Sequence, residues 1–144
     1  ISASAAYVFG LNGLLSFDYS YKDYSQIKFT PINGPNFNDL NNTIENTLKA
    51  VSTYKVGAEF RRNQLSIRGG FHYEESPYVN NSIVGDLMGF SFGGGYNFGR
   101  FTCDLAYSRS EQERNQQLYS VGLTDTANIN STYSNLVATL GFNF

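Results

Sequence analysis

The sequence predicts an all-β protein, a transmembrane antiparallel up-and-down β-barrel of which about seven strands are present. Three observations predict this fold. Apolar and polar residues alternate over most of the 144 residues, and successive side chains of a strand face opposite sides of a sheet. Tight turns alternate with long polar connections, as they do in outer-membrane barrels. The sequence holds no run of about 18 apolar residues, which excludes a helical membrane span.

The alternation gives the expected strands in order along the chain. They occupy residues 4–11, 14–29, 51–62, 65–76, 87–98, 101–118 and 132–144. On the second of them, Leu15, Phe17 and Tyr19 alternate with Ser16 and Asp18. We expect the apolar set of each strand to face lipid and the polar set to face the lumen.

The connections between these strands fall into two classes of length. Asn12-Gly13, Asn63-Gln64 and Gly99-Arg100 predict tight turns, and Asn-Gly is a strong hairpin signal. The long polar connections lie at about 30–50, 77–86 and 119–131. This sorting predicts periplasmic turns and extracellular loops.

The strand directions predict an incomplete wall. The last strand follows a long loop and so runs toward the periplasm, and counting back gives the first strand the same direction. Bacterial single-chain barrels have even strand numbers, and unpaired strand edges are untenable in lipid. We therefore expect residues 1–144 to be the C-terminal portion of a larger barrel. The missing N-terminal half, or another chain, would pair with the first strand.

Composition excludes several classes of function. A formal net charge of −2 and a pI near 5.3 argue against nucleic-acid binding. A mean hydropathy of −0.32 fits a barrel, in which only alternate residues meet lipid. His72 and Cys103 are the single histidine and cysteine, so we expect neither a metal site nor an internal disulfide. No nucleophile and base occur at catalytic spacing, so we expect no catalysis and no cofactor. Residues 1–5 lack the basic and apolar segments of a signal peptide.

Arg68 is the first candidate binding residue. It lies mid-strand on the expected lumen face, with Glu59 and Arg61 on the neighbouring strand. Arginine binds carboxylates through two parallel hydrogen bonds, so Arg68 could hold the head group of a fatty acid. The alternative is a ladder of lumen charges in which Arg68 pairs with Glu59, Asp18 or residues outside this chain.

The first long loop predicts a short helix at residues 39–50 with Asp39 as a possible cap. Its apolar stripe could capture an entering lipid, or it could pack on the barrel rim. The stripe and the apolar residues that precede it are Leu40, Ile44, Leu48, Phe29, Pro31, Ile32 and Phe37.

Two further patterns have structural explanations. Gly93-Gly94-Gly95 predicts bending or close approach of neighbouring residues rather than a phosphate loop, because no helix pattern or lysine follows. Aromatic residues near the strand ends predict two interfacial girdles, made of Tyr19, Tyr21, Tyr54, Tyr73, Tyr107, Phe98, Phe101 and Phe144.

The C-terminal strand places an apolar set on one face, namely Leu136, Ala138, Leu140, Phe142 and Phe144. This pattern resembles the last strand of bacterial outer-membrane barrels, whose final aromatic residue is read by the barrel-assembly machinery. The resemblance implies a place in the bacterial outer membrane, with its lipid and that machinery as partners.

The third and fourth expected strands carry a family resemblance. It lies in residues 53–61 (TYKVGAEFR), 65–73 (LSIRGGFHY) and 76–78 (SPY), and extends to 41–50 and 137–142. These stretches resemble the FadL/TodX family of outer-membrane hydrophobic-compound transporters, in particular its Bacteroidetes-type members. Members have fourteen-stranded barrels, so the resemblance implies that this chain is the C-terminal half. It also implies passive uptake of long-chain fatty acids or other hydrophobic small molecules.

Other functions remain open at this point. The family includes a secretion-system shuttle barrel, so the chain could be a scaffold or a partner subunit. A small porin-like barrel with an eighth strand would also fit the alternation.

Overall fold

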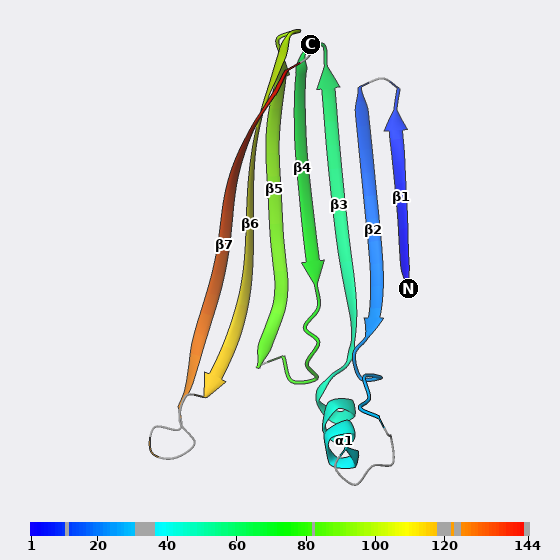
Figure 1. The fold of residues 1–144 in the computed structure, drawn as a ribbon, viewed down its shortest axis with the longest axis vertical. Helices are drawn as coiled ribbons and strands as arrows, with labels where there is room; N and C mark the ends of the chain where they lie inside the picture. Colours follow the sequence, from blue (N-terminus) through cyan, green and yellow to red (C-terminus); the bar gives the residue numbers. More distant parts are fainter. Residues whose placement is uncertain (11, 31–36, 82, 118–121, 123–124, 143–144) are drawn as a thin grey trace.

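The computed structural model describes residues 1–10, 12–30, 37–81, 83–117, 122 and 125–142. In these residues seven strands form one antiparallel sheet in the order in which they follow along the chain, and one helix lies in a loop (Figure 1). The all-β, up-and-down arrangement of seven strands is therefore confirmed. The sheet is open, with the first and last strands as its edges. The elements are β1 (Ser2–Phe9), β2 (Gly13–Asp23), α1 (Asn38–Thr47), β3 (Ala50–Arg62), β4 (Leu65–Glu74), β5 (Val84–Asn97), β6 (Phe101–Gln117) and β7 (Thr126–Phe142).

The connections are sorted by length between the two ends of the sheet (Figure 1). Tight turns join β1 to β2, β3 to β4 and β5 to β6 at one end, called here the short-turn end. Asn63 turns the chain there in the left-handed region with φ 54°, which asparagine tolerates better than most residues. The opposite end, the long-loop end, carries the connections 24–49, 75–83 and 118–125. Helix α1 lies in the first of these. The tight turns and the long connections are thus at opposite ends of the sheet, as the sequence predicts.

The strand register gives the sheet two chemically different faces. Partners across an antiparallel ladder share a face, so each row of partners can be followed across the sheet. One such row is Tyr7, Leu15, Ala58, Gly69, Phe92, Tyr107 and Leu136, which belongs to the apolar face. The adjacent row on the polar face, called here the central row, is Ala6, Ser16, Gly57, Gly70, Ser91, Ser108 and Asn135.

The apolar face is exposed, and the residues that the structure describes form almost no hydrophobic core. Val51 is the only hydrophobic residue that is buried among those the structure describes. By contrast, Phe92 is 58% exposed and Leu136 is 69% exposed. A soluble domain buries such residues, because apolar burial is the main driving force of folding. The described residues include no helix with the length and apolar character of a membrane span.

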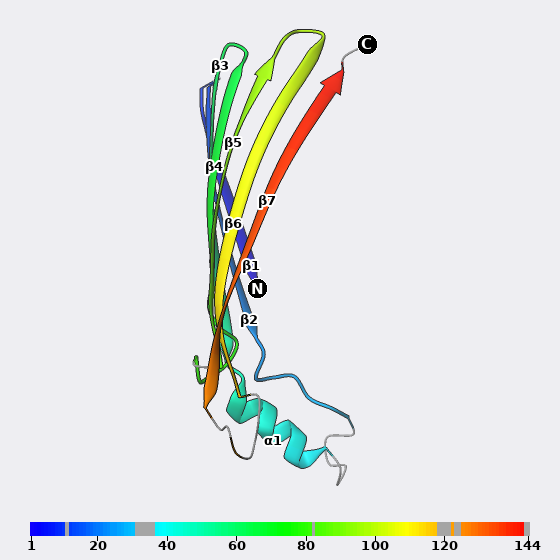
Figure 2. The same cartoon turned by 90° about the vertical axis from the view of Figure 1, so that its left-hand side faces the viewer.

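The polar face is the crowded side of a curved sheet. A Cβ atom added at Gly57, Gly70 or Gly93, all on this face, would lie within 3 Å of a neighbouring atom. On the apolar face, the nearest atom to such a Cβ is 3.9 Å away at Gly69 and 3.7 Å away at Gly94. Around the middle of the sheet in Figure 2, β1 and β7 lie to the same side of β3, β4 and β5, and α1 extends toward that side. Side chains converge on the concave face of a curved sheet, so the crowding identifies the polar face as the concave one.

Two strand boundaries differ from the sequence-based expectation by six residues, and the other described boundaries differ by three or fewer. β2 ends at Asp23 rather than at residue 29, because the Asp23 carboxylate accepts hydrogen bonds from the backbone N–H and the hydroxyl of Ser25 and so forms a turn. β7 begins at Thr126 rather than at residue 132, in a stretch that is largely polar on both faces. The expected strand ends at Leu11, Leu118 and Phe144 lie outside the described residues.

Candidate functional site

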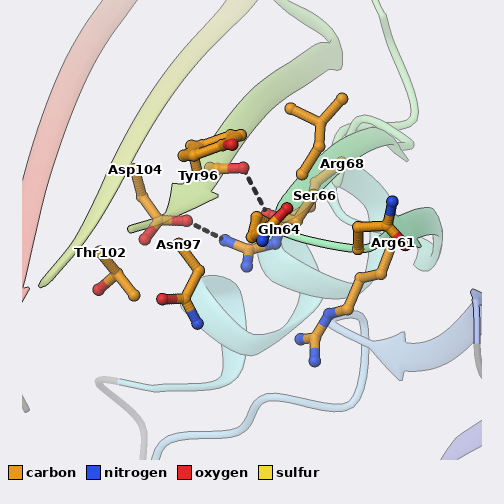
Figure 3. A pocket seen from close by; sticks show the side chains of 11 residues that line it. Arg61, Gln64, Ser66, Arg68, Tyr96, Asn97, Thr102 and Asp104 are labelled. Carbon is orange, nitrogen blue, oxygen red and sulfur yellow. Dashed lines mark hydrogen bonds and ion pairs between the residues drawn. The ribbon is translucent and has the colours of Figure 1, made fainter. Parts of the chain in front are cut away.

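A network of four charged side chains lies on the polar face near the short-turn end. Arg68 on β4 contacts Glu59 on β3, with 3.4 Å between Nε and Oε2. Its Nη1 atom donates a hydrogen bond to Oδ1 of Asp104 on β6 at 3.1 Å. Arg61 also pairs with Glu59. Arg61, Arg68 and Asp104 line a shallow cavity of about 290 Å³, together with Asn97, Thr102 and Gln64 (Figure 3).

The Arg68–Asp104 pair crosses over a strand, because β4 and β6 are separated by β5. The polar-face residues of β5 beneath the pair are Gly93 and Gly95. A Cβ at Gly95 would collide with the Asp104 carboxylate, and a Cβ at Gly93 would lie 2.9 Å from the carbonyl oxygen of Leu105. Gly93 and Gly95 therefore allow close approach, as the sequence predicts, whereas the Cβ position of Gly94 on the other face is open. The glycines leave room for a guanidinium and a carboxylate to meet across β5.

Arg68 therefore has partners within the chain. Glu59 was an expected partner, whereas Asp18 lies one further strand away, on β2, and makes no ion pair within the described residues. Asp104 was not expected, because sequence spacing does not reveal a contact between strands that are not neighbours. The side chain of Arg68 stays 47% exposed, so a carboxylate ligand could still reach it.

Helix α1 and the segment before it form an apolar cluster at the long-loop end. The side-chain amide of Asn41, which is 8% exposed, exchanges two hydrogen bonds with the backbone of Phe29, at 2.8 and 3.1 Å. The rings of Phe29 and Phe37 stack with centroids 5.8 Å apart. Ile27, Phe29 and Leu40 are each nearly half exposed. The cluster is thus held in place and still presents apolar surface to its surroundings.

The structure corrects three details of this helix. The N-cap residue is Phe37, without a side-chain cap, and Asp39 lies in the first turn, where a negative charge favours the helix dipole. The covered side of the helix contains Asn41 with the half-buried Ile44. The helix ends at Thr47 rather than at residue 50, so Leu48 follows it in extended conformation and forms a bridge with Tyr78. Leu40 is on the exposed side, so the residues of the expected apolar stripe do not share one side of the helix. The expected contributors Pro31 and Ile32 lie outside the described residues.

A polar anchor fixes the second long loop to the sheet. Asp86, at a bulge in β5 outside the apolar stretch, accepts a hydrogen bond from the Tyr73 hydroxyl at 2.5 Å and one from the Ser76 N–H at 2.8 Å. These bonds lower the pKa of Asp86 from its ordinary value, although its partial burial opposes the shift. Ser76, only 1% exposed, donates its hydroxyl hydrogen to the carbonyl of Val84. The alternation of apolar and polar residues in the sequence does not predict this hydrogen-bonded anchor.

The C-terminal strand has the expected arrangement of its apolar residues. Leu136, Ala138, Leu140 and Phe142 lie in rows of the apolar face, opposite Tyr107, Leu105, Cys103 and Phe101. Leu140 and Phe142 are 63% and 65% exposed. Phe144, the final aromatic of the expected assembly signal, lies outside the described residues. Within those residues, His72 and Cys103 belong to no cluster that could hold a metal ion.

Comparison of the chain with protein-family models, with curated proteins and with solved structures gives no match. The resemblance to the FadL/TodX family therefore stays an expectation, and the functional argument depends on the geometry.

Proposed function

We propose that this chain is part of the wall of an outer-membrane β-barrel that passes hydrophobic molecules, such as long-chain fatty acids. The observation that carries the proposal is the reversed polarity of the sheet. Its apolar face is exposed and its polar face is concave and crowded. A barrel wall needs this arrangement, because lipid meets the outside and a polar lumen is inside.

The position of the apolar residues supports a tilted barrel. The apolar run of β2, Leu15–Tyr21, starts in the same row in which the run of β6, Phe101–Tyr107, ends. The apolar band therefore shifts by six residues over four strand steps. With about 3.3 Å per residue and about 4.8 Å between strands, this shift corresponds to a tilt of about 45°, at the upper end of the range of membrane barrels.

The height of the band supports the same conclusion. On β4 it extends from Leu65 to Tyr73, a distance along the strand of about 26 Å. At the tilt given above, the band is about 20 Å high, close to the roughly 25 Å of outer-membrane barrels. Beyond it, β6 continues with Arg109 and Glu111 on the same face.

The two free edges support a wall that continues beyond this sheet. β1 and β7 run in the same direction, so an antiparallel closure needs an odd number of further strands. Two copies of this sheet would instead meet in parallel pairs. Neither edge strand carries a charge or a proline, the residues that protect free edges in soluble proteins. An N-terminal barrel half with seven strands would supply an odd number of strands and would pair with both unprotected edges. The barrel-assembly machinery would join the two halves as one wall.

The cluster at α1 is the proposed capture point for the hydrophobic substrate. Ile27, Phe29 and Leu40 expose apolar surface outside the band, where no lipid covers them. Asn41 holds this surface in place. A molecule that leaves water there would next meet the concave side of the sheet, toward which α1 extends (Figure 2).

An uptake assay tests the proposal. In a strain that lacks the gene, the complete protein should restore uptake of a labelled long-chain fatty acid. Leu40→Asp should lower the restored uptake several-fold, because it places a charge on the capture surface, whereas Asn42→Asp on the exposed side of the same helix should not. Failure of the unmodified protein to restore uptake would contradict a transport function.

One observation favours a second candidate, a scaffold or secretion-shuttle barrel. The central row of the polar face is made almost entirely of glycine, alanine and serine, which would let a plug pack tightly against the wall. A lumen filled by such a plug, with no bound detergent or lipid in the purified protein, would support this candidate over transport.

A further inference from the structure

The charged residues of the chain are distributed unequally between the two ends of the sheet. On the short-turn side of the central row lie four arginines and two carboxylates, a net charge of +2. The remaining six basic and ten acidic residues lie on the other side, a net charge of −4. The two carboxylates at the short-turn end, Glu59 and Asp104, face the lumen and are paired with Arg61 and Arg68. The excess positive charge therefore belongs to Arg62 and Arg100.

These two arginines border a continuous aromatic and apolar surface. Arg62 is the ladder partner of Leu65, and Leu65 is the partner of Tyr96. The Tyr96 ring lies 4.6 Å from that of Phe98, which stacks on Phe101 at 4.4 Å. Arg100 lies in the turn between these two phenylalanines. Both arginines are exposed, and neither makes an ion pair within the described residues.

We propose that this basic rim (Arg62, Leu65, Tyr96, Phe98, Arg100 and Phe101) binds the phosphate groups of anionic phospholipids in the leaflet at the short-turn end. The proposal rests on the membrane placement given above. Arginine stems can lie along the edge of the apolar band while the guanidinium groups reach the head groups. Guanidinium and phosphate form paired, charge-assisted hydrogen bonds, and aromatic rings settle at the same depth.

The other outward-facing arginine provides a matched control. Arg109 lies on the same face of the sheet at the long-loop end, where it pairs with Glu111. Its charge is already compensated, and the end to which it belongs is acidic. Replacement of Arg109 should therefore leave the lipid preference of the short-turn end unchanged.

Lipid selectivity in reconstituted bilayers tests the proposal. The complete protein is reconstituted with spin-labelled phosphatidylglycerol or phosphatidylcholine, and the motionally restricted fraction of each lipid is measured. The unmodified protein should prefer the anionic lipid by up to about fivefold per arginine, and high salt should weaken the preference. The double variant Arg62→Gln/Arg100→Gln should bring the ratio near one, and Arg109→Gln should retain it.

The outcomes separate this proposal from the membrane placement. Restricted lipid without an anionic preference, or an equal loss of preference in Arg109→Gln, would overturn the basic rim alone. The absence of restricted lipid of either kind would overturn the membrane placement as well.

Discussion

Gly93 and Gly94 are neighbours in the chain, yet they show how different the two faces of the sheet are. On the polar face, a side chain at Gly93 would press against the backbone of β6. On the apolar face, Gly94 has open space, with the nearest atom 3.7 Å from an added Cβ. The large apolar residues around Gly94 are nevertheless the exposed ones. The face that resembles a protein interior in composition is the exposed one, and the polar face is the crowded one.

The largest expected effect comes from a charge on the apolar face. Phe92→Arg should destabilise the protein in a lipid bilayer by about 2–4 kcal/mol, because Phe92 lies near the middle of the apolar band. Ser91→Arg, one residue away on the polar face, should cost less, because its flexible side chain can extend away from the crowded central row into water. Urea unfolding of both variants in vesicles measures the difference. Equal costs would contradict the assignment of the two faces.

A smaller effect should distinguish the glycines. Gly93→Ala should cost about 1–3 kcal/mol, because the new methyl group meets a backbone carbonyl that cannot move freely. Gly94→Ala should change the stability by less than about 0.5 kcal/mol. The same unfolding measurement applies. A larger cost at Gly94 would mean that the apolar face is the crowded one.

The anchor at Asp86 should make the long-loop end sensitive to acid. Because hydrogen bonds from Tyr73 and Ser76 lower the pKa of Asp86 in the folded state, its contribution is present above the ordinary pKa of 3.8 and is lost as the pH falls through the lowered value. Asp86→Asn should cost about 1–2 kcal/mol near neutral pH and remove this part of the acid dependence. Unfolding free energies of both proteins across this pH range test it. An unchanged acid profile in the variant would contradict the role of the anchor.

The smallest effect is expected at the charged network. Arg68→Gln should lower the stability by at most about 1 kcal/mol, because its side chain is 47% exposed and solvent weakens both ion pairs. A loss as large as that of Phe92→Arg would show that the charged network, rather than the apolar face, stabilises the sheet.

Local patterns explain why much of this fold could be predicted. The faces of Leu15, Phe17 and Tyr19 follow from the two-residue period of a strand, and Asn63-Gln64 carries its own turn chemistry. Consecutive strands that are joined by tight turns pair in an antiparallel way, which accounts for the sheet. These features depend on residues that are close in sequence, so no knowledge of distant contacts is needed.

The remaining features depend on distant contacts or on residues with no alternation. β7 was expected to start at residue 132, because Thr126 and the residues after it are largely polar on both faces. The pairing of Arg68 with Asp104 requires the register of three strands and the glycines between them. The exposed position of Leu40 follows from the contact of Asn41 with Phe29, which the helical period alone does not specify.

The most direct test of the central claim uses the single cysteine of the chain. Cys103 is exposed on the apolar face, and Thr102 precedes it on the polar face. A spin label on Cys103 of the membrane-embedded protein should be relaxed strongly by oxygen, which dissolves in lipid, and weakly by a water-soluble nickel complex. A label on Thr102→Cys in a Cys103→Ser background should be less accessible to oxygen than the Cys103 label. Strong relaxation of the Cys103 label by the nickel complex would contradict a lipid-facing apolar surface.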